Sequence, residues 1–244
     1  MKKEKVRLDK LLVDRCLAPT KQQATGIILS GDVFVDGVLS DKAGRLVSEN
    51  AEISIKSRMP YVSRGGLKLE EAIQTFQINV EGKIALDIGA STGGFTDYLL
   101  QHGAKKVYAV DVGYGQLHWK LREDPQVVNL EKMHILKLDW RLIEETIDIA
   151  AIDVSFISLT RILPALWEHL LSPVIIIALV KPQFEVGKKD VGRGGIVRDK
   201  KKVEEALSKV VQFAEGVGFK MKGVIPSPIL GHKGNTEYLL YLER

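Results

Sequence analysis

The chain has 244 residues, of which 45% are hydrophobic and 27% are charged, so a packed core is expected and wholesale disorder is excluded. Its single cysteine, Cys16, excludes an intrachain disulfide framework and a zinc ribbon. No apolar run reaches the roughly 18 residues of a membrane-spanning helix, and no signal-like apolar stretch follows the basic start. We therefore expect a cytoplasmic protein without a membrane partner.

The net charge of +4 is unevenly distributed along the chain. Residues 1–68 contain 13 Lys and Arg against 8 Asp and Glu, whereas the remaining residues contain 22 against 23. A basic excess confined to the first quarter of a chain indicates a nucleic-acid-binding module.

Residues 1–57 are predicted to form a small α+β domain. An apolar face at residues 8–12 predicts one helix, and the capping-box spacing of Thr20 and Gln23 predicts the start of a second. A short strand follows and ends at Asp36-Gly37, a dipeptide typical of β-hairpins.

Polar side chains on these two predicted helices are candidates for binding a phosphate backbone, although charge alone fits a solvated helix face equally well. The run R-L-D at residues 7–9 and the pattern G-x-V-x-V-x-G at residues 31–37 decide between the two interpretations. Residues 6–65 resemble the RNA-binding domain named after ribosomal protein S-four. That resemblance implies shape-directed RNA binding by the two helices, with these candidates: Arg7, Lys10, Arg15, Lys21 and Gln22.

Residues 58–66 are expected to link this domain to a second one at residues 67–244, because Pro60 and the Gly65-Gly66 pair are typical of a break. In the second domain, apolar strands alternate with helices, which predicts an α/β fold with a mostly parallel, doubly wound, Rossmann-like sheet. The predicted strands are residues 83–88, 107–110, 136–140, 149–152, 174–180 and 238–242, and the clearest helices are 95–102 and 203–217.

The run D-I-G-A-S-T-G-G-F-T at residues 87–96 follows the first of these strands, at the end where open α/β sheets bind ligands. Its glycines match neither the dinucleotide pattern nor a Walker A loop. Asp111 and Asp139 end the next two predicted strands, where a carboxylate can accept from ribose hydroxyls. Carboxylates without a phosphate loop favour a cationic nucleoside cofactor, S-adenosylmethionine. The candidate cofactor-binding residues are Asp87, Gly89, Ser91, Thr92, Gly93, Gly94, Phe95, Asp111, Val112 and Asp139.

The catalytic candidates are Lys68, Asp153, Lys181 and Glu237. Methyltransferases that modify exocyclic amines usually carry two prolines after the fourth strand, and D-V-S-F at residues 153–156 has none, which disfavours base methylation. The four residues resemble, in order and context, the K-D-K-E tetrad of the FtsJ-like ribose 2′-O-methyltransferases.

Five runs resemble the TlyA family, which joins an S-four-type domain to an FtsJ-like class I methyltransferase domain. They are Y-V-S-R-G-G-x-K-L at 61–69, the run at 87–96, D-V-S-F-I-S at 153–158, L-V-K-P-Q-F-E at 179–185 and G-N-x-E at 234–237. The resemblance covers nearly the whole chain. It implies S-adenosylmethionine-dependent methylation of cytidine 2′-hydroxyls in 23S rRNA and, in some members, 16S rRNA, with ribosomal RNA or ribosomal subunits as partners and no DNA.

A ribose hydroxyl is a poor nucleophile, so methyl transfer to it needs in-line geometry and help with the proton. Lys181 is the candidate general base; alternatively it only holds the ribose oxygen while proximity does most of the work. Asp153 and Glu237 would orient the lysines and balance their charge, and Lys68 would position the hydroxyl or a flanking phosphate.

The glycine-rich, basic segment at residues 185–195 is either a loop that closes over RNA or a plain solvated loop. With Arg64, its cations Lys188, Lys189 and Arg193 complete the RNA-binding candidates, and no metal site is assigned. Two other functions stay open at this point: a ribosome-associated RNA-binding factor with a non-catalytic methyltransferase scaffold, and a membrane-lytic hemolysin. The sequence leaves the oligomeric state open.

Overall fold

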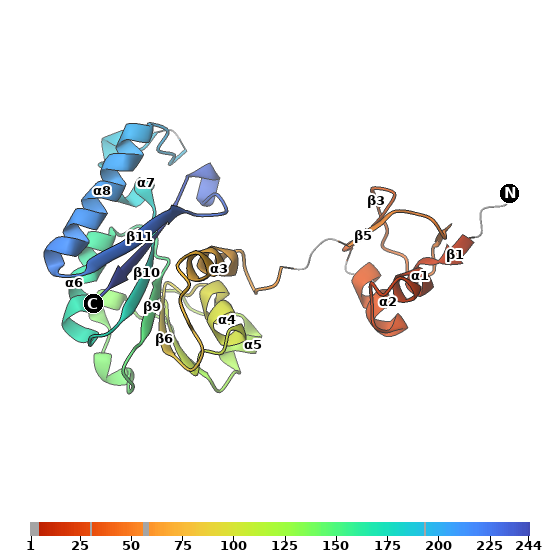
Figure 1. The fold of residues 1–244 in the computed structure, drawn as a ribbon, viewed down its shortest axis with the longest axis horizontal. Helices are drawn as coiled ribbons and strands as arrows, with labels where there is room; N and C mark the ends of the chain where they lie inside the picture. The colour runs from red at the N-terminus through yellow and green to blue at the C-terminus, as the bar shows by residue number, and fades with distance from the viewer. Residues whose placement is uncertain (1–4, 30, 56–58, 193) are drawn as a thin grey trace. The chain divides into compact units, whose positions relative to one another are not determined.

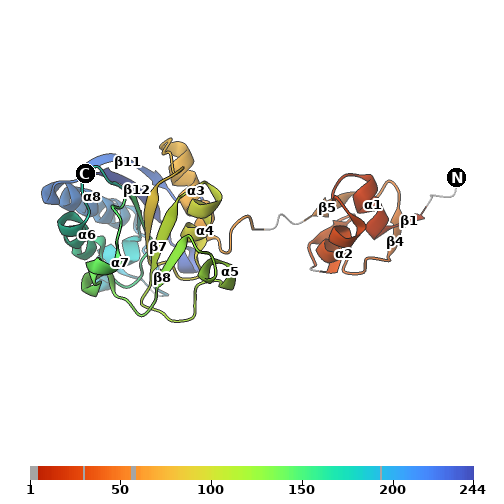
Figure 2. The same ribbon diagram turned by 90° about the horizontal axis from the view of Figure 1, so that it is seen from below.

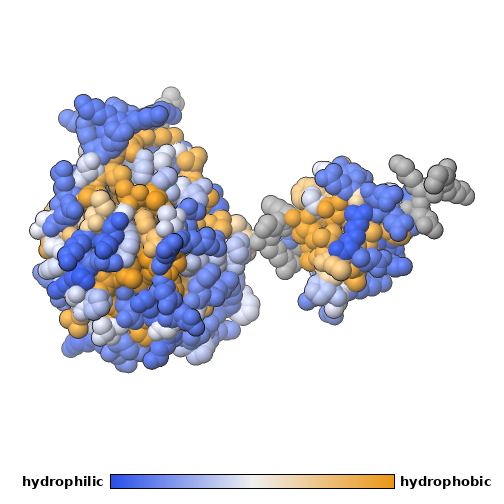
Figure 3. All heavy atoms as spheres, viewed as in Figure 1, coloured by the Kyte–Doolittle hydropathy of each residue, from blue (hydrophilic) through white to orange (hydrophobic). Residues whose placement is uncertain are grey.

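The computed structural model describes residues 5–29, 31–55, 59–192 and 194–244. The chain forms two compact units, Met1–Pro60 and Tyr61–Arg244 (Figure 1). Figure 3 shows hydrophilic side chains over much of the visible face of the larger unit and a patch of apolar side chains on the visible face of the smaller one. No helix among the described residues is long and apolar enough to cross a bilayer.

The smaller unit packs two helices against short strands, as predicted. Thr20 Oγ1 accepts from the Gln23 backbone N–H at 3.2 Å, so the second helix begins where the capping-box spacing placed it. Asp36 and Gly37 both have positive φ, +51° and +76°, as a two-residue hairpin turn requires. The elements are β1 (Lys5–Arg7), α1 (Leu8–Asp14), α2 (Lys21–Leu29), β2 (Val33–Val35), β3 (Val38–Leu39), β4 (Leu46–Ser48) and β5 (Ile53–Ile55). β3, β2 and β5 form one antiparallel sheet, and β1 pairs with β4.

The larger unit is built on a seven-stranded sheet with the order β11-β12-β10-β9-β6-β7-β8. Its strands are β6 (Ile84–Ile88), β7 (Lys106–Val110), β8 (Val127–Leu130), β9 (Ile149–Ile152), β10 (Ile175–Val180), β11 (Lys220–Pro226) and β12 (Tyr238–Glu243). All neighbours are parallel except β12, which runs antiparallel to both β10 and β11. The predicted doubly wound α/β fold is confirmed. The strand order reverses between β6 and β9, the place where such sheets bind ligands.

Helices cover both faces of this sheet (Figures 1 and 2). The apolar cores place α6 (Leu159–His169) and α8 (Lys200–Val217) on one face, and α3 (Gly65–Thr75) and α4 (Gly94–Gln101) on the other. The short α5 (Trp119–Arg122) and α7 (Pro182–Glu185), with 3₁₀ turns η1 (Ile135–Lys137), η2 (Trp140–Leu142), η3 (Lys188–Asp190) and η4 (His232–Gly234), complete the unit.

The predicted strand at residues 136–140 is wrong. The third strand of this half of the sheet is β8, and residues 135–142 form η1 and η2 instead. The pattern Leu136-Lys137-Leu138 looks like strand alternation in the sequence, but the two leucines do not share a face, since Leu136 is exposed and Leu138 is buried at the end of a 3₁₀ turn. Asp139 therefore caps η2, where its side chain accepts from the Arg141 N–H, and does not end a strand.

Most of the expected linker at residues 58–66 is packed into the larger unit. Tyr61 is only 5% exposed and its ring meets that of Tyr98 edge-on at 5.4 Å. The Val62 N–H donates to buried Asp97 at 2.7 Å, and Gly65 already begins α3. Residue 58 lies outside the described residues.

The side chains of the smaller unit that are predicted to bind RNA differ in their partners: some are paired with a carboxylate, some are exposed, and one is bonded to the backbone. Arg7 makes a two-point contact with Asp9, at 3.0 and 2.7 Å, and Lys21 Nζ lies 3.9 Å from the same carboxylate. Asp9 is 1% exposed, and the hydrogen bonds from Arg7 lower its pKa. This buried carboxylate therefore holds two candidate cations at one surface, while Lys10 and Gln22 are exposed. Arg15 instead donates to the backbone oxygens of residues 49 and 51.

We predict that Arg15→Met loosens the turn at residues 49–51, because its guanidinium satisfies two backbone carbonyls there. Loss of these bonds should cost about 1 kcal/mol, or about a five-fold acceleration of amide exchange in the segment. Hydrogen–deuterium exchange of the full chain measures this. Lys10→Met is the matched control, and equal exchange in both variants would contradict the structural role.

Candidate active site

The four predicted catalytic residues lie together at the carboxyl ends of the central strands. Lys68 comes from α3, Asp153 follows β9, Lys181 follows β10, and Glu237 immediately precedes β12. Lys68 Nζ lies 2.7 Å from Glu237 Oε2 and 3.8 Å from Asp153 Oδ2, and Lys181 Nζ lies 2.6 Å from Asp153 Oδ1. Asp153 is thus shared between the two lysines. Although 169 positions separate Lys68 from Glu237, they form one buried hydrogen bond.

This ion-paired cluster is largely withdrawn from water. Lys68 and Lys181 are each 9% exposed and Glu237 is 2% exposed. Ionised side chains are buried only when they are paired, and two ammonium groups here meet two carboxylates. Most of the free-energy cost of removing these groups from water is therefore incurred when the protein folds. The charges are then already fixed in place before any substrate binds.

A further side chain, Ser155, belongs to this cluster, although sequence analysis did not select it. Lys181 Nζ donates to Ser155 Oγ at 3.0 Å, and the same ammonium lies 6.0 Å from the centre of the Phe184 ring. The signal available in the sequence was its position two residues after Asp153 in the run D-V-S-F.

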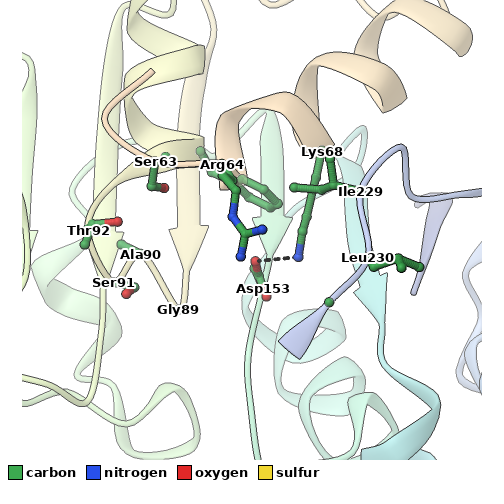
Figure 4. A pocket seen from close by; sticks show the side chains of 14 residues that line it. Ser63, Arg64, Lys68, Gly89, Ala90, Ser91, Thr92, Asp153, Ile229 and Leu230 are labelled. Atoms are coloured by element: carbon green, nitrogen blue, oxygen red, sulfur yellow. Dashed lines mark ion pairs between the residues drawn. The ribbon is translucent and has the colours of Figure 1, made fainter. Parts of the chain in front are cut away.

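Two cavities meet at Asp153, whereas Lys181 and Glu237 line neither of them. The smaller, about 280 Å³, is lined by Lys68, Arg64 and Ser63 on one side and by residues 229–231 on the other. The larger, about 520 Å³, lies toward β7 and β8 and is lined by Asp111, Gln116 and residues 133–135. Both share Gly89, Ser91 and Asp153. Figure 4 shows the Arg64 and Lys68 side chains pointing toward Asp153 from above it.

The glycine-rich turn after β6 owes its shape to close backbone contacts. Gly89 has φ +87°, and a Cβ there would lie 2.4 Å from the Asp153 carbonyl oxygen. Gly93 has φ +94°, and its Cβ would lie 2.3 Å from Leu121. Only glycine fits at both positions, since a side chain would be strained and would also collide. The turn after β6 therefore touches the loop that carries Asp153.

Asp111 is positioned to meet a polyhydroxyl ligand. Its Oδ2 accepts from the Ser91 N–H at 2.8 Å and its Oδ1 from the Gly113 N–H at 2.6 Å. A carboxylate has about four acceptor positions, so two remain for hydroxyls in the larger cavity. The cavity, the carboxylate at its wall and the glycine turn fit a nucleoside cofactor.

The other predicted cofactor residues divide into two groups. Gly89, Ser91, Thr92, Gly94, Phe95, Asp111 and Val112 line one or both cavities. Asp87, Gly93 and Asp139 line neither. Gly93 packs beneath α5, and Asp139 pairs with Arg141 at 2.7 Å on the surface because the strand expected to carry it does not exist. Residues 133–135, which were not predicted, line the cavity wall instead.

Asp87 lies beneath the glycine turn and is completely buried. Its Oδ2 accepts from the backbone N–H and the hydroxyl of Thr96, at 2.9 and 2.6 Å, whereas Oδ1 has no hydrogen-bond partner among the described residues. Burial raises the pKa of Asp87 to about 7, the Thr96 bonds oppose that rise, and the charges of Asp153 and Asp111 add to it. Asp87 therefore braces the start of α4 from below.

The basic segment predicted to cover RNA is fixed near the cluster. Asn235, two residues before Glu237, accepts from the Val197 N–H at 3.1 Å and donates to the Gly195 oxygen at 2.9 Å. Arg64 lines the smaller cavity and Lys189 is exposed on η3. Arg193 lies outside the described residues, as does the side chain of Lys188.

We predict that Asp87 makes folding stability depend on pH near neutrality. The pKa of Asp87 is about 7 in the folded protein, against an ordinary value of 3.8. The stabilising contribution of its protonated form to the free energy of unfolding is therefore complete below about pH 4 and is lost as pH rises through about 7. The free energy of unfolding should fall by a few kcal/mol across that window. Asp87→Asn should flatten the fall, as measured by urea titration at several pH values. Asp139→Asn is the surface control; an unchanged slope in Asp87→Asn would refute the assignment.

Comparison with known proteins agrees with this geometry. Residues 61–244 match the FtsJ-like methyltransferase family, and residues 6–53 match the S4 domain. The chain is 44% identical over 240 residues to the Mycobacterium tuberculosis protein named 16S/23S rRNA (cytidine-2′-O)-methyltransferase TlyA. The aligned region covers 98% of this chain and 90% of that relative. It is also 43% identical over 237 residues to Hemolysin A of Brachyspira hyodysenteriae, and that alignment covers 97% of this chain and 99% of the relative.

A solved structure, "Putative hemolysin from Streptococcus thermophilus", shares 46% identity and a TM-score of 0.75, and the match covers 99% of this chain and 89% of that one. The family match takes in the whole larger unit, and the relatives align along nearly the entire chain. The resemblance drawn from the five sequence runs is confirmed: the chain belongs to the TlyA family of FtsJ-like methyltransferases, with an S4 domain ahead of its methyltransferase domain.

Proposed function

We propose that this protein transfers a methyl group from S-adenosylmethionine to the 2′-hydroxyl of a cytidine in ribosomal RNA. The observation that carries the proposal is the ion-paired cluster of Lys68, Asp153, Lys181 and Glu237, of which Asp153 lines both cavities and Lys68 the smaller one. The name of the Mycobacterium tuberculosis relative supports the reaction class and the substrate. The S4 domain supports an RNA partner, and the same proposal assigns the protein to ribosomal subunits in the cytoplasm.

The larger cavity would hold the cofactor. Asp111 would accept from its ribose hydroxyls, Gly89 and Ser91 would lie against it, and the braced turn above Asp87 would keep these groups in place. When bound, S-adenosylmethionine supplies an electrophilic methyl group on a positively charged sulfur. The carboxylates at this end of the sheet complement that charge.

Lys181 would hold the substrate oxygen. Its ammonium has three N–H donors; one hydrogen-bonds to Ser155 while the charge pairs with Asp153, so a donor is left for the ribose 2′-oxygen. A donor fixed in this way orients the hydroxyl and stabilises negative charge that develops on its oxygen as the proton departs to water. Lys68, fixed by Glu237, would act in the same way on the neighbouring ribose or phosphate oxygen.

Phe156 would support the target base. Its side chain is 91% exposed at the rim of the larger cavity, its φ is +65°, and its ring lies 5.1 Å from that of Phe184. A phenylalanine in the left-handed region and open to water is costly, and such strain persists where it serves a site. An aromatic face beside the cluster offers a stacking surface for an unpaired base.

The test is tritium transfer from labelled S-adenosylmethionine to 23S rRNA, 16S rRNA, and large and small ribosomal subunits that lack the modification, followed by nuclease digestion. Label on a cytidine ribose supports the proposal and identifies the subunit. Label on a base would retain the fold but overturn the role of the cluster. Cofactor binding without transfer to any of these RNAs would overturn the proposed substrate.

We predict that Lys181→Ala lowers kcat by at least about 100-fold, because the donor to the 2′-oxygen is lost. Lys181→Arg should retain more activity than the alanine variant, because arginine still donates hydrogen bonds to the 2′-oxygen. Arginine cannot accept a proton, so activity in this variant would not come from a general base. Single-turnover methyl transfer measures both variants, with Lys202→Ala, whose ammonium pairs with Glu205, as the control. Equal losses in the two Lys181 variants would indicate a general base instead.

We also predict that Phe156→Ala raises the KM for RNA by roughly five-fold or more, as expected for one lost base-stacking contact. Because the ring is exposed, thermal stability should stay near that of the unchanged protein. Phe156→Tyr should restore the KM. If the alanine variant kept a normal KM for RNA, the stacking role would be wrong.

A further inference from the structure

The segment that follows β7 exposes large apolar side chains beside the larger cavity. Val112 is 66% exposed, Tyr114 70% and Trp119 68%. Scattered exposed apolar residues are ordinary, but three within eight residues, two of them aromatic, are a local concentration on a segment that lines a cavity. Asp111, Val112 and Gln116 line that cavity, so the segment forms its rim.

Packing explains the position of this segment without either aromatic ring. Leu117 and Leu121, 5% and 2% exposed, are its buried anchors and belong to the core beneath. The His118 N–H donates to the Thr92 oxygen at 3.2 Å, which joins the segment to the glycine turn. Trp119 lies between the two buried leucines in sequence and is turned outward. The fold therefore does not require the rings of Tyr114 and Trp119.

A positive charge is held against one of these rings. Lys132 has φ +57°, a left-handed conformation that is uncommon for lysine, and its N–H donates to the Gly113 oxygen at 2.9 Å. This conformation accompanies a contact in which Lys132 Nζ lies 4.1 Å from the centre of the exposed Tyr114 ring. With the ammonium over one face of the exposed Tyr114 ring, a base would stack on the opposite face and its phosphate would meet the ammonium, so the pair matches a nucleotide.

We propose that Tyr114 and Trp119 form a stacking platform for single-stranded RNA on the cofactor side of the site, taking bases of nucleotides that flank the methylated one. The inference rests on the proposed function for the identity of the RNA. It adds a second aromatic surface to the one at Phe156, and Lys132 meets the backbone of the strand that crosses it. Single-stranded RNA is the occupant because stacked bases and a phosphate account for both the rings and the cation.

Kinetics of the full chain provide the first test. Tyr114→Ala and Trp119→Ala should each raise the KM for RNA by roughly five-fold or more, whereas Trp119→Phe, which keeps a ring, should raise it less. Lys132→Gln should weaken the dependence of RNA affinity on salt. The control is Phe213→Ala, which removes a partly exposed aromatic side chain on α8, away from the segment after β7. S-adenosylmethionine affinity, measured by calorimetry, should stay within about two-fold in all variants.

Tryptophan fluorescence provides a test that does not depend on methyl transfer. The emission of Trp119 is the difference between the spectra of the unchanged protein and of Trp119→Phe. A single-stranded oligocytidylate should quench this emission, and a duplex of equal length should not. Quenching in a protein that methylates no RNA would leave the platform standing while the proposed function fails. Methylation with no quenching and an unchanged KM in Trp119→Ala would overturn the platform. A loss of cofactor affinity in the Trp119 and Tyr114 variants would overturn it too, since the segment would then serve the cofactor.

Discussion

The pairing of two buried lysines with two carboxylates is the interaction on which the rest of this site depends. Lys68 and Lys181 can leave water only if Asp153 and Glu237 accompany them, so the start of α3, the ends of β9 and β10 and the start of β12 must meet at one place. The antiparallel final strand serves this requirement, because β12 reaches β10 with Glu237 at the same edge as Lys181. The charge pairs therefore set a condition on the topology as well as on the chemistry.

Neighbouring loops are tied to the cluster by groups that take no part in it. Glu185 is 5% exposed, and burial raises its pKa. It accepts from the Ser158 hydroxyl at 2.5 Å and from the Leu159 N–H at 2.9 Å. These bonds join the segment after Lys181 to the end of the loop after Asp153. Both loops are thus fixed at two points, through Lys181 to Ser155 and through Glu185 to Ser158, and Phe156 projects from the stretch between them.

The sequence predicts the fold well where strands are buried and poorly where they are not. All residues of β6 are buried, and so are all but the first of β10, so these strands stand out as apolar runs. β8 is half-buried throughout and β11 is mostly exposed, so neither has a comparable signal. The Gly65-Gly66 pair suggested a break between domains, but these glycines begin α3, and a Cβ on Gly66 would lie 2.3 Å from the Tyr61 ring. The tetrad could be identified by motif, and the run D-V-S-F contained Ser155 as well, whereas residues 133–135 depend on three-dimensional packing that no local pattern encodes.

Charge at the strand ends is divided between the two cavities. Asp153 is engaged by both lysines, so Asp111 is the carboxylate left at the wall of the larger cavity, and Asp87 lies buried behind the glycine turn. One oxygen of Asp87 has no hydrogen-bond partner within the described part of the chain, and burial raises the pKa of this carboxyl to about 7, so close to neutral pH it is protonated in a large share of the molecules. A nearby positive charge stabilises a carboxylate and lowers its pKa. Under the proposed function, binding of a sulfonium cofactor would thus lower the protonated fraction of Asp87. The free-energy cost of burying its carboxylate would fall when the site fills.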